Sequence, residues 1–234
     1  MTTNVRSAAD LPYASRWCRS RHKRYIDIFA AASSLVCLSP LLVVLGLAIV
    51  ITSGQPIVFC QWRVGRSGQL FQLYKFRTMT VSAAADGPGL TRRGDPRVTW
   101  IGKLLRHSKL DELPQLFNVL KGDMTLVGPR PDLKEFWSAA TATEREVLTL
   151  KPGITGAASL SFRGEEQLLA QVPPDRLTSF YLQHVLPEKC RLDMQYAAQA
   201  TLWRDCRLLW RTLLVPMLQL RNVERVSDAQ VPGR

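Results

Sequence analysis

The longest apolar stretch of the sequence is residues 26–52, which read IDIFAAASSLVCLSPLLVVLGLAIVIT and contain one charged residue, Asp27. This stretch exceeds the roughly 20 apolar residues that a helix needs to span a bilayer. It is too long for the apolar region of a cleavable signal peptide, and no clear cleavage site follows it. The sequence therefore predicts a membrane segment over residues 21–53.

The charges on both sides of this segment bear on its topology. Basic residues precede it and follow it: Arg16, Arg19, Arg21, Lys23 and Arg24, then Arg63, Arg66, Lys75 and Arg77. Basic flanks stay in the cytoplasm, so a straight span would leave one flank on the wrong side. Pro40 bends or breaks a helix, and the Ser39 hydroxyl can bond a carbonyl that the proline frees. We expect a re-entrant helix that breaks at Ser39 and Pro40; a straight transmembrane helix with a tolerated proline is the alternative.

The composition of the whole chain limits the class of partner. The 234 residues include 31 Lys and Arg against 19 Asp and Glu, a formal charge of +12. Such a surplus indicates a polyanionic partner, which is a nucleic acid, an anionic membrane or a phosphorylated substrate. The five cysteines and three histidines have neither zinc spacing nor a compact disulfide pattern, so reduced thiols facing the cytosol are expected.

Local patterns predict an α+β fold that is mostly helical. We expect a flexible basic arm over residues 1–20, a cytosolic catalytic domain over residues 54–221 and a flexible tail over residues 222–234. Within the domain, strands at 57–64 and 70–79 form a short hairpin, helical periodicity runs over 98–121, and turns lie at 128–131 and 151–156. Residues 163–221 look mostly helical. Their last part mixes tryptophans with arginines, which suits either an amphipathic helix in the membrane interface or a helix packed on the core.

The adjacent carboxylates Asp111 and Glu112 are the first candidates for chemistry. A bare Asp-Glu pair is usually a solvated helix end. Here apolar residues surround the pair, and Lys103, Arg106, Lys109 and Lys121 lie nearby in the sequence. A carboxylate among cations stays ionised at neutral pH and can attack phosphorus or hold a metal ion.

Further cations fall in constrained settings that suit phosphate recognition. Alternation along a strand puts Lys75 and Arg77 on one face, and Arg130 is fixed between Pro129 and Pro131. A diphosphate with Mg²⁺ would use several such cations together, Arg106 and Arg163 among them. For each one alone, a surface salt bridge or a lipid headgroup contact is the alternative.

Four stretches carry a resemblance to a known family. They are KRYIDIFAAASSLVCLSPLL (23–42), FCQWRVGRSGQLFQLYKFRTM (59–79), DPRVTWIGKLLRHSKLDELPQLFNVLKGDMTLVGPRP (95–131) and LKPGITG (150–156). From about residue 21 to about residue 215 the chain resembles the bacterial sugar transferases, the monotopic polyprenol-phosphate phosphoglycosyl transferases. Its length is similar to that of the minimal members.

The resemblance implies an activity. It implies transfer of a sugar phosphate from a UDP-sugar to undecaprenyl phosphate, with UMP released, at the cytoplasmic face of the bacterial inner membrane. It assigns the nucleophile to Asp111, a partner role to Glu112, Mg²⁺ beside Asp111, and the nucleotide and phosphate region to Arg130. It also matches Ser39–Pro40 to the break of a re-entrant helix among inner-membrane lipids, and it leaves the sugar and a homodimer undecided.

The sequence departs from the family pattern at two places, and it leaves two rival functions to consider. Ser159 stands where many relatives have glutamine, although Arg163 keeps its register, and the turn at 53–56 reads SGQP instead of SxGP. These changes put the sugar in doubt more than the reaction. A non-catalytic scaffold of a polysaccharide assembly complex would need an altered Asp-Glu pair, and this pair is intact. A nucleic-acid or anionic-lipid binder explains the charge but neither Pro40 nor DELPQL, so no nucleic acid is expected.

Overall fold

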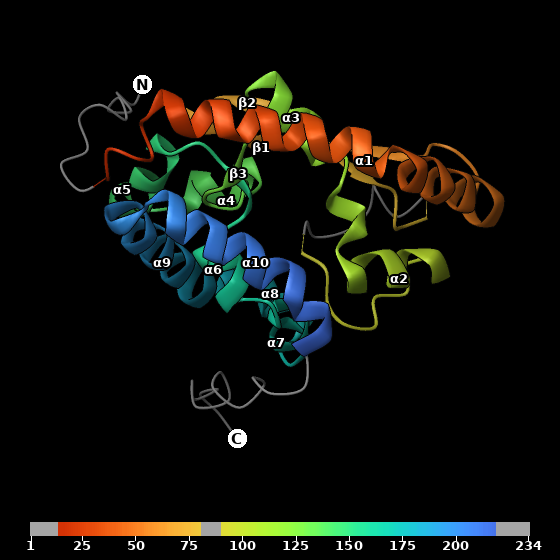
Figure 1. Cartoon of the computed structure of the whole chain (residues 1–234). Helices are drawn as coiled ribbons and strands as arrows, with labels where there is room; N and C mark the ends of the chain where they lie inside the picture. The colour runs from red at the N-terminus through yellow and green to blue at the C-terminus, as the bar shows by residue number, and fades with distance from the viewer. Residues whose placement is uncertain (1–13, 81–89, 219–234) are drawn as a thin grey trace.

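The computed structural model describes residues 14–80 and 90–218, and it is mostly helical with two small sheets (Figure 1). The α-helices are α1 (Arg21–Ser53), α2 (Trp100–Ser108), α3 (Gln115–Lys121), α4 (Lys134–Ala139), α5 (Ala142–Arg145), α6 (Ala157–Ser161), α7 (Glu165–Ala170), α8 (Leu177–Phe180), α9 (Leu186–Gln199) and α10 (Leu202–Leu218). The strands are β1 (Val58–Val64), β2 (Leu70–Phe76), β3 (Thr125–Val127) and β4 (Gly153–Thr155). Shorter helical turns are η2 (Arg66–Gly68), η4 (Leu110–Glu112), η5 (Glu146–Thr149), η6 (Pro174–Arg176) and η7 (Tyr181–Val185).

Helix α1 is the longest element and runs along one side of the molecule (Figure 1). The hydroxyl of Ser20 accepts a hydrogen bond from the Lys23 amide and begins the helix, and Gly54 follows its last turn with a φ of 75°. Its 33 residues are about 50 Å long. Among the described residues, it is the one helix long and apolar enough to cross a membrane. Several of its large apolar side chains are exposed: Phe29, Val36, Val43, Val44, Leu47 and Ile51.

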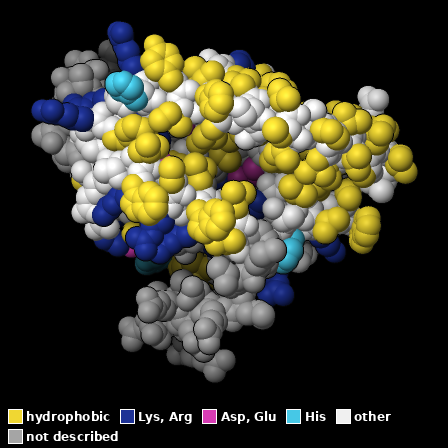
Figure 2. All heavy atoms as spheres, viewed as in Figure 1, with side chains coloured by type: hydrophobic (Ala, Val, Ile, Leu, Met, Phe, Trp, Pro, Cys, Tyr) yellow, Lys and Arg dark blue, Asp and Glu magenta, His cyan; other side chains and the backbone are white. Residues whose placement is uncertain are grey.

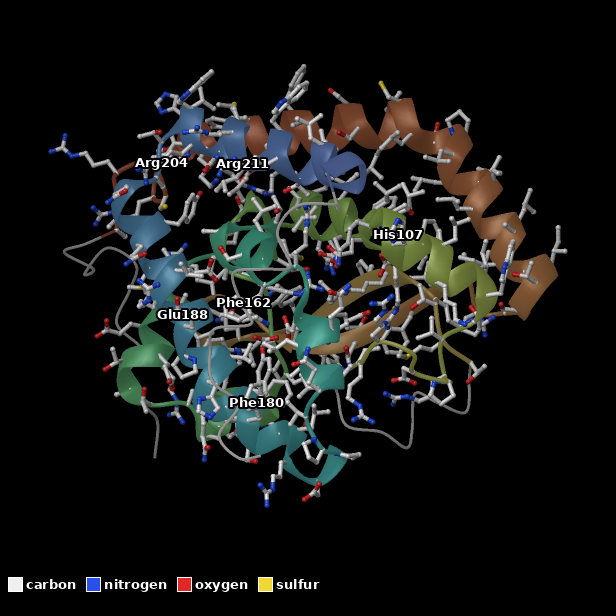
Figure 3. All side chains as sticks on the ribbon, turned by 90° about the horizontal axis from the view of Figure 1, so that it is seen from below. His107, Phe162, Phe180, Glu188, Arg204 and Arg211 are labelled. Atoms are coloured by element: carbon white, nitrogen blue, oxygen red, sulfur yellow. The ribbon has the colours of Figure 1, made fainter. Side chains whose placement is uncertain are left out.

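Pro40 lies inside α1 without interrupting it. The helix is continuous across Pro40, where the sequence predicts a break, and Figure 3 shows that α1 changes direction along its length. The Ser39 hydroxyl donates to the carbonyl of Val36, 2.8 Å away, within the preceding turn. A proline removes one backbone hydrogen bond and its ring crowds the preceding turn. A helix that stays continuous across a proline therefore bends there.

Both ends of α1 pack on the same globular body. Near its start, Arg24 donates to the carbonyl of Val119 at the end of α3, at 2.6 Å. One turn later, the Asp27 carboxylate accepts from the Thr125 hydroxyl on β3. Near its end, Ile49 is completely buried, in a cluster with Phe76, Ile101 and Leu105. The helix also contacts this body between its ends, through Ala31 and Leu42, so it lies along the globular part.

The predicted hairpin is present, with β1 and β2 antiparallel and Val64 opposite Leu70. Alternating residues of β2, Phe71 and Leu73, are buried against α1 and α3, which is the period-2 pattern of a strand with one covered face. Ser67 and Gly68 have φ values of 58° and 77° and make the tight turn. The strand β2 ends at Phe76, so Arg77 lies just beyond it.

A second, parallel sheet pairs β3 with β4. The sequence predicted neither strand, and β4 lies within the turn expected at 151–156. The two chain segments approach very closely at their glycines. A Cβ atom on Gly153 would lie 2.1 Å from the backbone nitrogen of Gly128, and one on Gly156 would lie 2.2 Å from the Gly128 carbonyl oxygen. Glycine is therefore required for this crossing, which sets the loop of Pro129, Arg130 and Pro131 against the start of α6.

The described part of the N-terminal arm is packed, which corrects the expectation of a flexible arm up to residue 20. Ala14 is buried, and the Ser15 amide donates to the Ala197 carbonyl at 2.8 Å. The Trp17 indole donates to Asp205 of α10 at 2.8 Å. Residues 1–13 and the expected tail over 222–234 lie outside the described residues.

Helix α10 packs on the core with one side and exposes apolar residues on the other. Leu208 and Leu209 pack against Val127 and Tyr196 in the core. The other side exposes Leu202, Trp203, Trp210 and Leu213 beside the arginines Arg204 and Arg211 that Figure 3 labels. Figure 2 shows hydrophobic side chains along both α1 and α10 on one face of the molecule, with acidic atoms visible in a hollow between them.

Candidate active site

The acidic pair lies on a short 3₁₀ turn between two helices. Helix α2 ends at Lys109, whose φ of 59° is left-handed, and η4 carries Asp111 and Glu112 before α3 begins after Pro114. The sequence predicted continuous helical periodicity here, but Pro114 lacks the amide that such a helix would use. The interruption turns both carboxyl groups inward, where Asp111 is 6% and Glu112 is 8% exposed.

Glu112 is held by two cations. Its Oε1 atom lies 2.8 Å from Nη2 of Arg130 and 3.5 Å from Nζ of Lys75. Burial by itself would raise the pKa of Glu112, but the charges of Arg130 and Lys75 outweigh burial and hold this pKa well below its usual range. The same pairing raises the pKa of Arg130. Glu112 is therefore an ionised, immobilised carboxylate at neutral pH.

Asp111 has the opposite surroundings. Its Oδ1 atom is buried and has no hydrogen-bond partner. Burial, and secondly the charge of Glu112, raise the pKa of Asp111. A buried carboxylate oxygen without a partner is costly unless something else binds it, so this atom is available to an electrophile or a metal ion.

The surroundings of Asp111 fit Mg²⁺ as a ligand of oxygen atoms. Mg²⁺ is usually bound through one or two protein carboxylates together with substrate phosphates and waters. The free Oδ1 atom of Asp111 supplies such a ligand. The described residues contain no group of three His, Cys, Asp or Glu side chains that would form an all-protein metal cage. The donor set thus suits a metal ion that arrives with a phosphate substrate.

Lys75 and Arg130 both lie beside the acidic pair, where they contact Glu112. Burial lowers the pKa of Lys75 to about 8, although the charge of Glu112 opposes this shift. Pro129 and Pro131 are buried on either side of Arg130, and the Pro129 carbonyl accepts from the Gly153 amide at 2.8 Å. The close crossing of the two loops therefore fixes where the Arg130 guanidinium lies.

Arg77 and Arg106 make other contacts. The Arg77 guanidinium donates to the carbonyls of Ser53, Gly54 and Gln55 just after α1, so it closes the end of that helix. Arg106 donates to the Thr78 hydroxyl at 3.0 Å and pairs with Glu166 of α7, also at 3.0 Å. Neither guanidinium contacts a carboxylate of the pair.

Arg163 lies apart from the pair as well, just after α6. It is partly buried, and burial lowers its pKa. It makes no hydrogen bond or ion pair with any residue in the described ranges 14–80 and 90–218. Ser159, where many relatives have glutamine, has a buried hydroxyl without a partner.

Sequence reasoning missed three polar residues around the pair. Asn118 is completely buried and joins α3 to β2: it accepts from the Tyr74 amide at 3.0 Å and donates to the Gln72 carbonyl at 2.7 Å. Gln115 lies one turn earlier on the same helix, and Arg63 lies on β1. The available signal was the spacing of Gln115 and Asn118, because two amides at i and i+3 share one face of an otherwise apolar helix.

The fold and the site together define a class of protein. A long apolar helix is anchored to a helical body, and that body holds one free carboxylate beside a second carboxylate bound by cations. Catalysis of phosphoryl transfer rests on such positioning and charge neutralisation. The chain belongs to the bacterial sugar transferase family, whose sequence profile matches residues 18–219. By family it is a transferase.

Three curated relatives indicate which reactions similar proteins catalyse. A UDP-glucose:undecaprenyl-phosphate glucose-1-phosphate transferase of Caulobacter vibrioides is 36% identical over 197 residues, covering 82% of this chain and 68% of the relative. A galactosyl transferase of Streptococcus agalactiae is 34% identical over 222 residues, covering 89% of this chain and 45% of the relative. A UDP-N-acetylgalactosamine-undecaprenyl-phosphate N-acetylgalactosaminephosphotransferase of Aeromonas hydrophila is 34% identical over 197 residues, covering 82% and 42%. The chain thus spans about half the length of two of these three relatives.

Proposed function

We propose that this chain transfers a sugar 1-phosphate from a UDP-sugar to undecaprenyl phosphate, giving undecaprenyl-diphosphate-sugar and UMP. The observation that carries the proposal is that the two adjacent carboxylates differ. Oδ1 of Asp111 has no hydrogen-bond partner, while Glu112 is bound by Arg130 and Lys75. The names of the relatives support undecaprenyl phosphate as acceptor. Because those relatives use glucose and N-acetylgalactosamine, the sugar is left open.

The proposed reaction has two displacements at one phosphorus atom. First, an Asp111 oxygen forms a bond to the sugar-linked phosphorus, and the bond from this phosphorus to the bridging oxygen breaks, so that UMP leaves. Second, an oxygen of the lipid phosphate attacks the same phosphorus and the Asp111–phosphorus bond breaks, which restores the carboxylate. Each step conserves charge and needs no oxidant or reductant.

In this proposed reaction the surrounding residues position Glu112 and neutralise the charge of the diphosphate. Arg130 and Lys75 keep Glu112 ionised and in place, and they bring positive charge to the diphosphate. Mg²⁺, when bound at Asp111 and the diphosphate, would offset the charge that develops on the leaving phosphate. Arg163 is a further candidate contact for the substrate, because it is partly buried and unpaired within the described residues.

For the membrane we propose a re-entrant arrangement at the cytoplasmic face of the inner membrane. Its support is that Arg24 near the start of α1 and Ile49 near the end both pack on the same globular body. A body on one side of a bilayer would keep both ends of α1 on that side. The apolar, exposed faces of α1 and α10 would enter the lipid, with the arginines of α10 at the headgroups. The acceptor phosphate would then arrive at headgroup depth.

The activity is tested by release of UMP from a panel of UDP-sugars, with undecaprenyl phosphate and Mg²⁺. We expect turnover with at least one donor and its loss in Asp111→Asn, together with loss of any trappable phosphosugar adduct. Asp175→Asn is the matched control, since this exposed acid on η6 undergoes the same change of group. An adduct that persists in Asp111→Asn moves the nucleophile elsewhere, and a wild type that is silent with every donor favours a non-catalytic scaffold.

The topology is tested by cysteine labelling from each side of the membrane. The native cysteines are first replaced by serine, and then Arg16→Cys and Gln55→Cys are made separately, because these exposed residues flank α1. We expect an impermeant maleimide to reach both positions from the cytoplasmic side. Labelling of the two positions from opposite sides would establish a straight span.

A further inference from the structure

A small polar opening lies beside the acidic pair, and its residues Arg63 and Gln115 have no role in the reaction as described. It is lined by Arg63, Leu73, Lys75, Gln115, Arg130 and Pro131, with about 210 Å³ of open space. Much of that space is continuous with the solvent, and the enclosed part has room for about one water-sized group. Three of its six lining residues are cations, so its chemistry suits an anion.

Arg63 brings a donor to this opening that no protein group satisfies. Its Nη2 donates to Oε1 of Gln61 at 2.6 Å. Its Nη1 lies 3.9 Å from Oδ1 of Asp132, beyond hydrogen-bond distance. Its Nε is buried and has no partner. The guanidinium is thus held in place on one side and left unsatisfied on another.

Asp132 forms a long ion pair with Arg63 but no hydrogen bond, and its carboxylate has a second partner. The Tyr181 hydroxyl donates to Oδ2 of Asp132 at 2.9 Å, and Lys189 donates to that hydroxyl at 3.2 Å. Glu112 already binds Arg130 and Lys75. The acids near the opening therefore have partners of their own, and none of them accepts from Nε of Arg63.

Gln115 supplies a second unsatisfied donor. Its side chain is 2% exposed, and its Nε2 atom is buried without a partner. Leaving a buried donor unpaired destabilises a fold, because the donor has lost its hydrogen bonds to water. Native folds rarely keep two such donors on one small opening unless a water or a ligand binds them.

We infer that this opening is a phosphate-binding pocket, in which Arg63 and Gln115 donate to phosphoryl oxygens alongside Lys75 and Arg130. The assignment of a phosphate rests on the proposed function. The phosphate belongs either to the diphosphate of the donor or to the lipid acceptor, and both offer the same oxygens. Arg63 provides a fixed fork that suits a phosphate, and Gln115 adds a neutral donor that selects oxygen acceptors.

Binding is tested without turnover, on the full chain in detergent, with inorganic pyrophosphate and UDP as probes and uridine as the phosphate-free control. We expect Arg63→Met to raise the Kd for pyrophosphate and UDP about tenfold to a hundredfold, the usual effect of losing a charged hydrogen bond. Arg66→Met is the matched control, because this exposed arginine of the same hairpin loses the same charge. We expect its Kd values to equal those of the wild type.

Gln115→Glu separates ligand binding from a structural role. It keeps the size of the side chain but replaces the unpaired donor with a carboxylate among three cations. We expect the Tm of the free protein to stay the same or rise, while the affinity for pyrophosphate falls at least about tenfold. A purely structural role of Gln115 predicts no loss of affinity, and that result would overturn the pocket.

Turnover measurements identify the source of the phosphate. Slower UMP release by Arg63→Met without lipid assigns the pocket to the donor. Normal release without lipid, followed by slow lipid-dependent turnover, assigns it to the acceptor. If both steps and the pyrophosphate Kd are unchanged in Arg63→Met, the pocket is disproved although the transferase stands. If pyrophosphate binding falls but no donor is turned over, the pocket stands and the proposed function fails.

Discussion

Two neighbouring carboxyl groups differ here because of what surrounds each side chain. Glu112 contacts Arg130 and Lys75, whereas Oδ1 of Asp111 contacts no donor. Glu112 thereby pairs with the nearby cations, and Asp111 keeps one oxygen without a hydrogen bond. Adjacent, coupled acids gain different properties in this way, and a sequence cannot state which of the two will be free.

Asp193 of α9 is another buried acid, and it makes stability depend on pH. Its Oδ1 accepts from the Ala158 amide at 3.1 Å, and burial raises its pKa to about 7. The folded state therefore binds this proton more tightly than the unfolded state, so the associated stability is complete at low pH and is lost as pH rises through about 7. We expect Asp193→Asn, which keeps the acceptor, to be more stable than the wild type at pH 8, by up to about 4 kcal/mol.

The measurement is the free energy of unfolding, or the Tm in detergent, between pH 5 and pH 8. The advantage of Asp193→Asn should grow with pH, because the wild type ionises a buried group over this range. Asp175→Asn, at an exposed acid, should show no such trend. A constant or shrinking advantage would mean that Asp193 does not titrate as described.

At the scale of elements, the break between α2 and α3 creates the site. Lys109 adopts a φ of 59°, a conformation that costs a side chain about 1 kcal/mol and glycine almost nothing. We expect Lys109→Gly to raise the free energy of unfolding by about 0.5–1 kcal/mol and the β-branched Lys109→Val to lower it. The check is the Tm of both variants beside Lys103→Ala, which removes an exposed lysine of α2 without changing the turn. Destabilisation by glycine equal to that by valine would contradict the role of φ.

The sequence predicted the long elements well and the short ones poorly. The hairpin was expected over 57–64 and 70–79 and is found over Val58–Val64 and Leu70–Phe76, because alternation over seven residues is a strong signal. The three-residue strands β3 and β4 were not predicted, and β4 lies where a turn was expected, since so short a run carries no period. The interruption of the helix at Lys109 was missed because the apolar spacing continues across it.

The candidate site was predicted in part. Lys75 and Arg130 were named from sequence, and the structure brings both to Glu112. Arg77 was named for the same reason, yet it donates to three carbonyls at the end of α1. A guanidinium suits a row of carbonyls as well as a phosphate, so residue type alone could not separate these roles.

At the scale of the whole molecule, a buried ion pair ties the membrane helix to the C-terminal helix. Lys23 of α1 pairs with Asp205 of α10, and Asp205 also accepts from Trp17 and Tyr196. We expect Lys23→Met to destabilise the protein by about 3–5 kcal/mol, because it leaves a buried carboxylate without its cation. The Tm in detergent and the rate of proteolysis measure the loss.

Two further variants serve as controls for Lys23→Met. Arg21→Met removes an exposed cation from the same turn of α1 and should leave the Tm unchanged. Adding Asp205→Asn to Lys23→Met should recover part of the loss, since it removes the uncompensated charge. A double variant less stable than Lys23→Met alone would show that the hydrogen bonds of Asp205 matter more than its charge.

The packing of both ends of α1 on one globular body has a consequence for how the chain is made. In the proposed arrangement no polar loop and none of the flanking arginines has to be carried across the hydrocarbon layer during synthesis. The apolar stretch can then enter the lipid from the ribosome's side after the globular part has begun to fold around Arg24 and Asp27. Assembly in the membrane would therefore need neither a translocation channel nor the membrane potential.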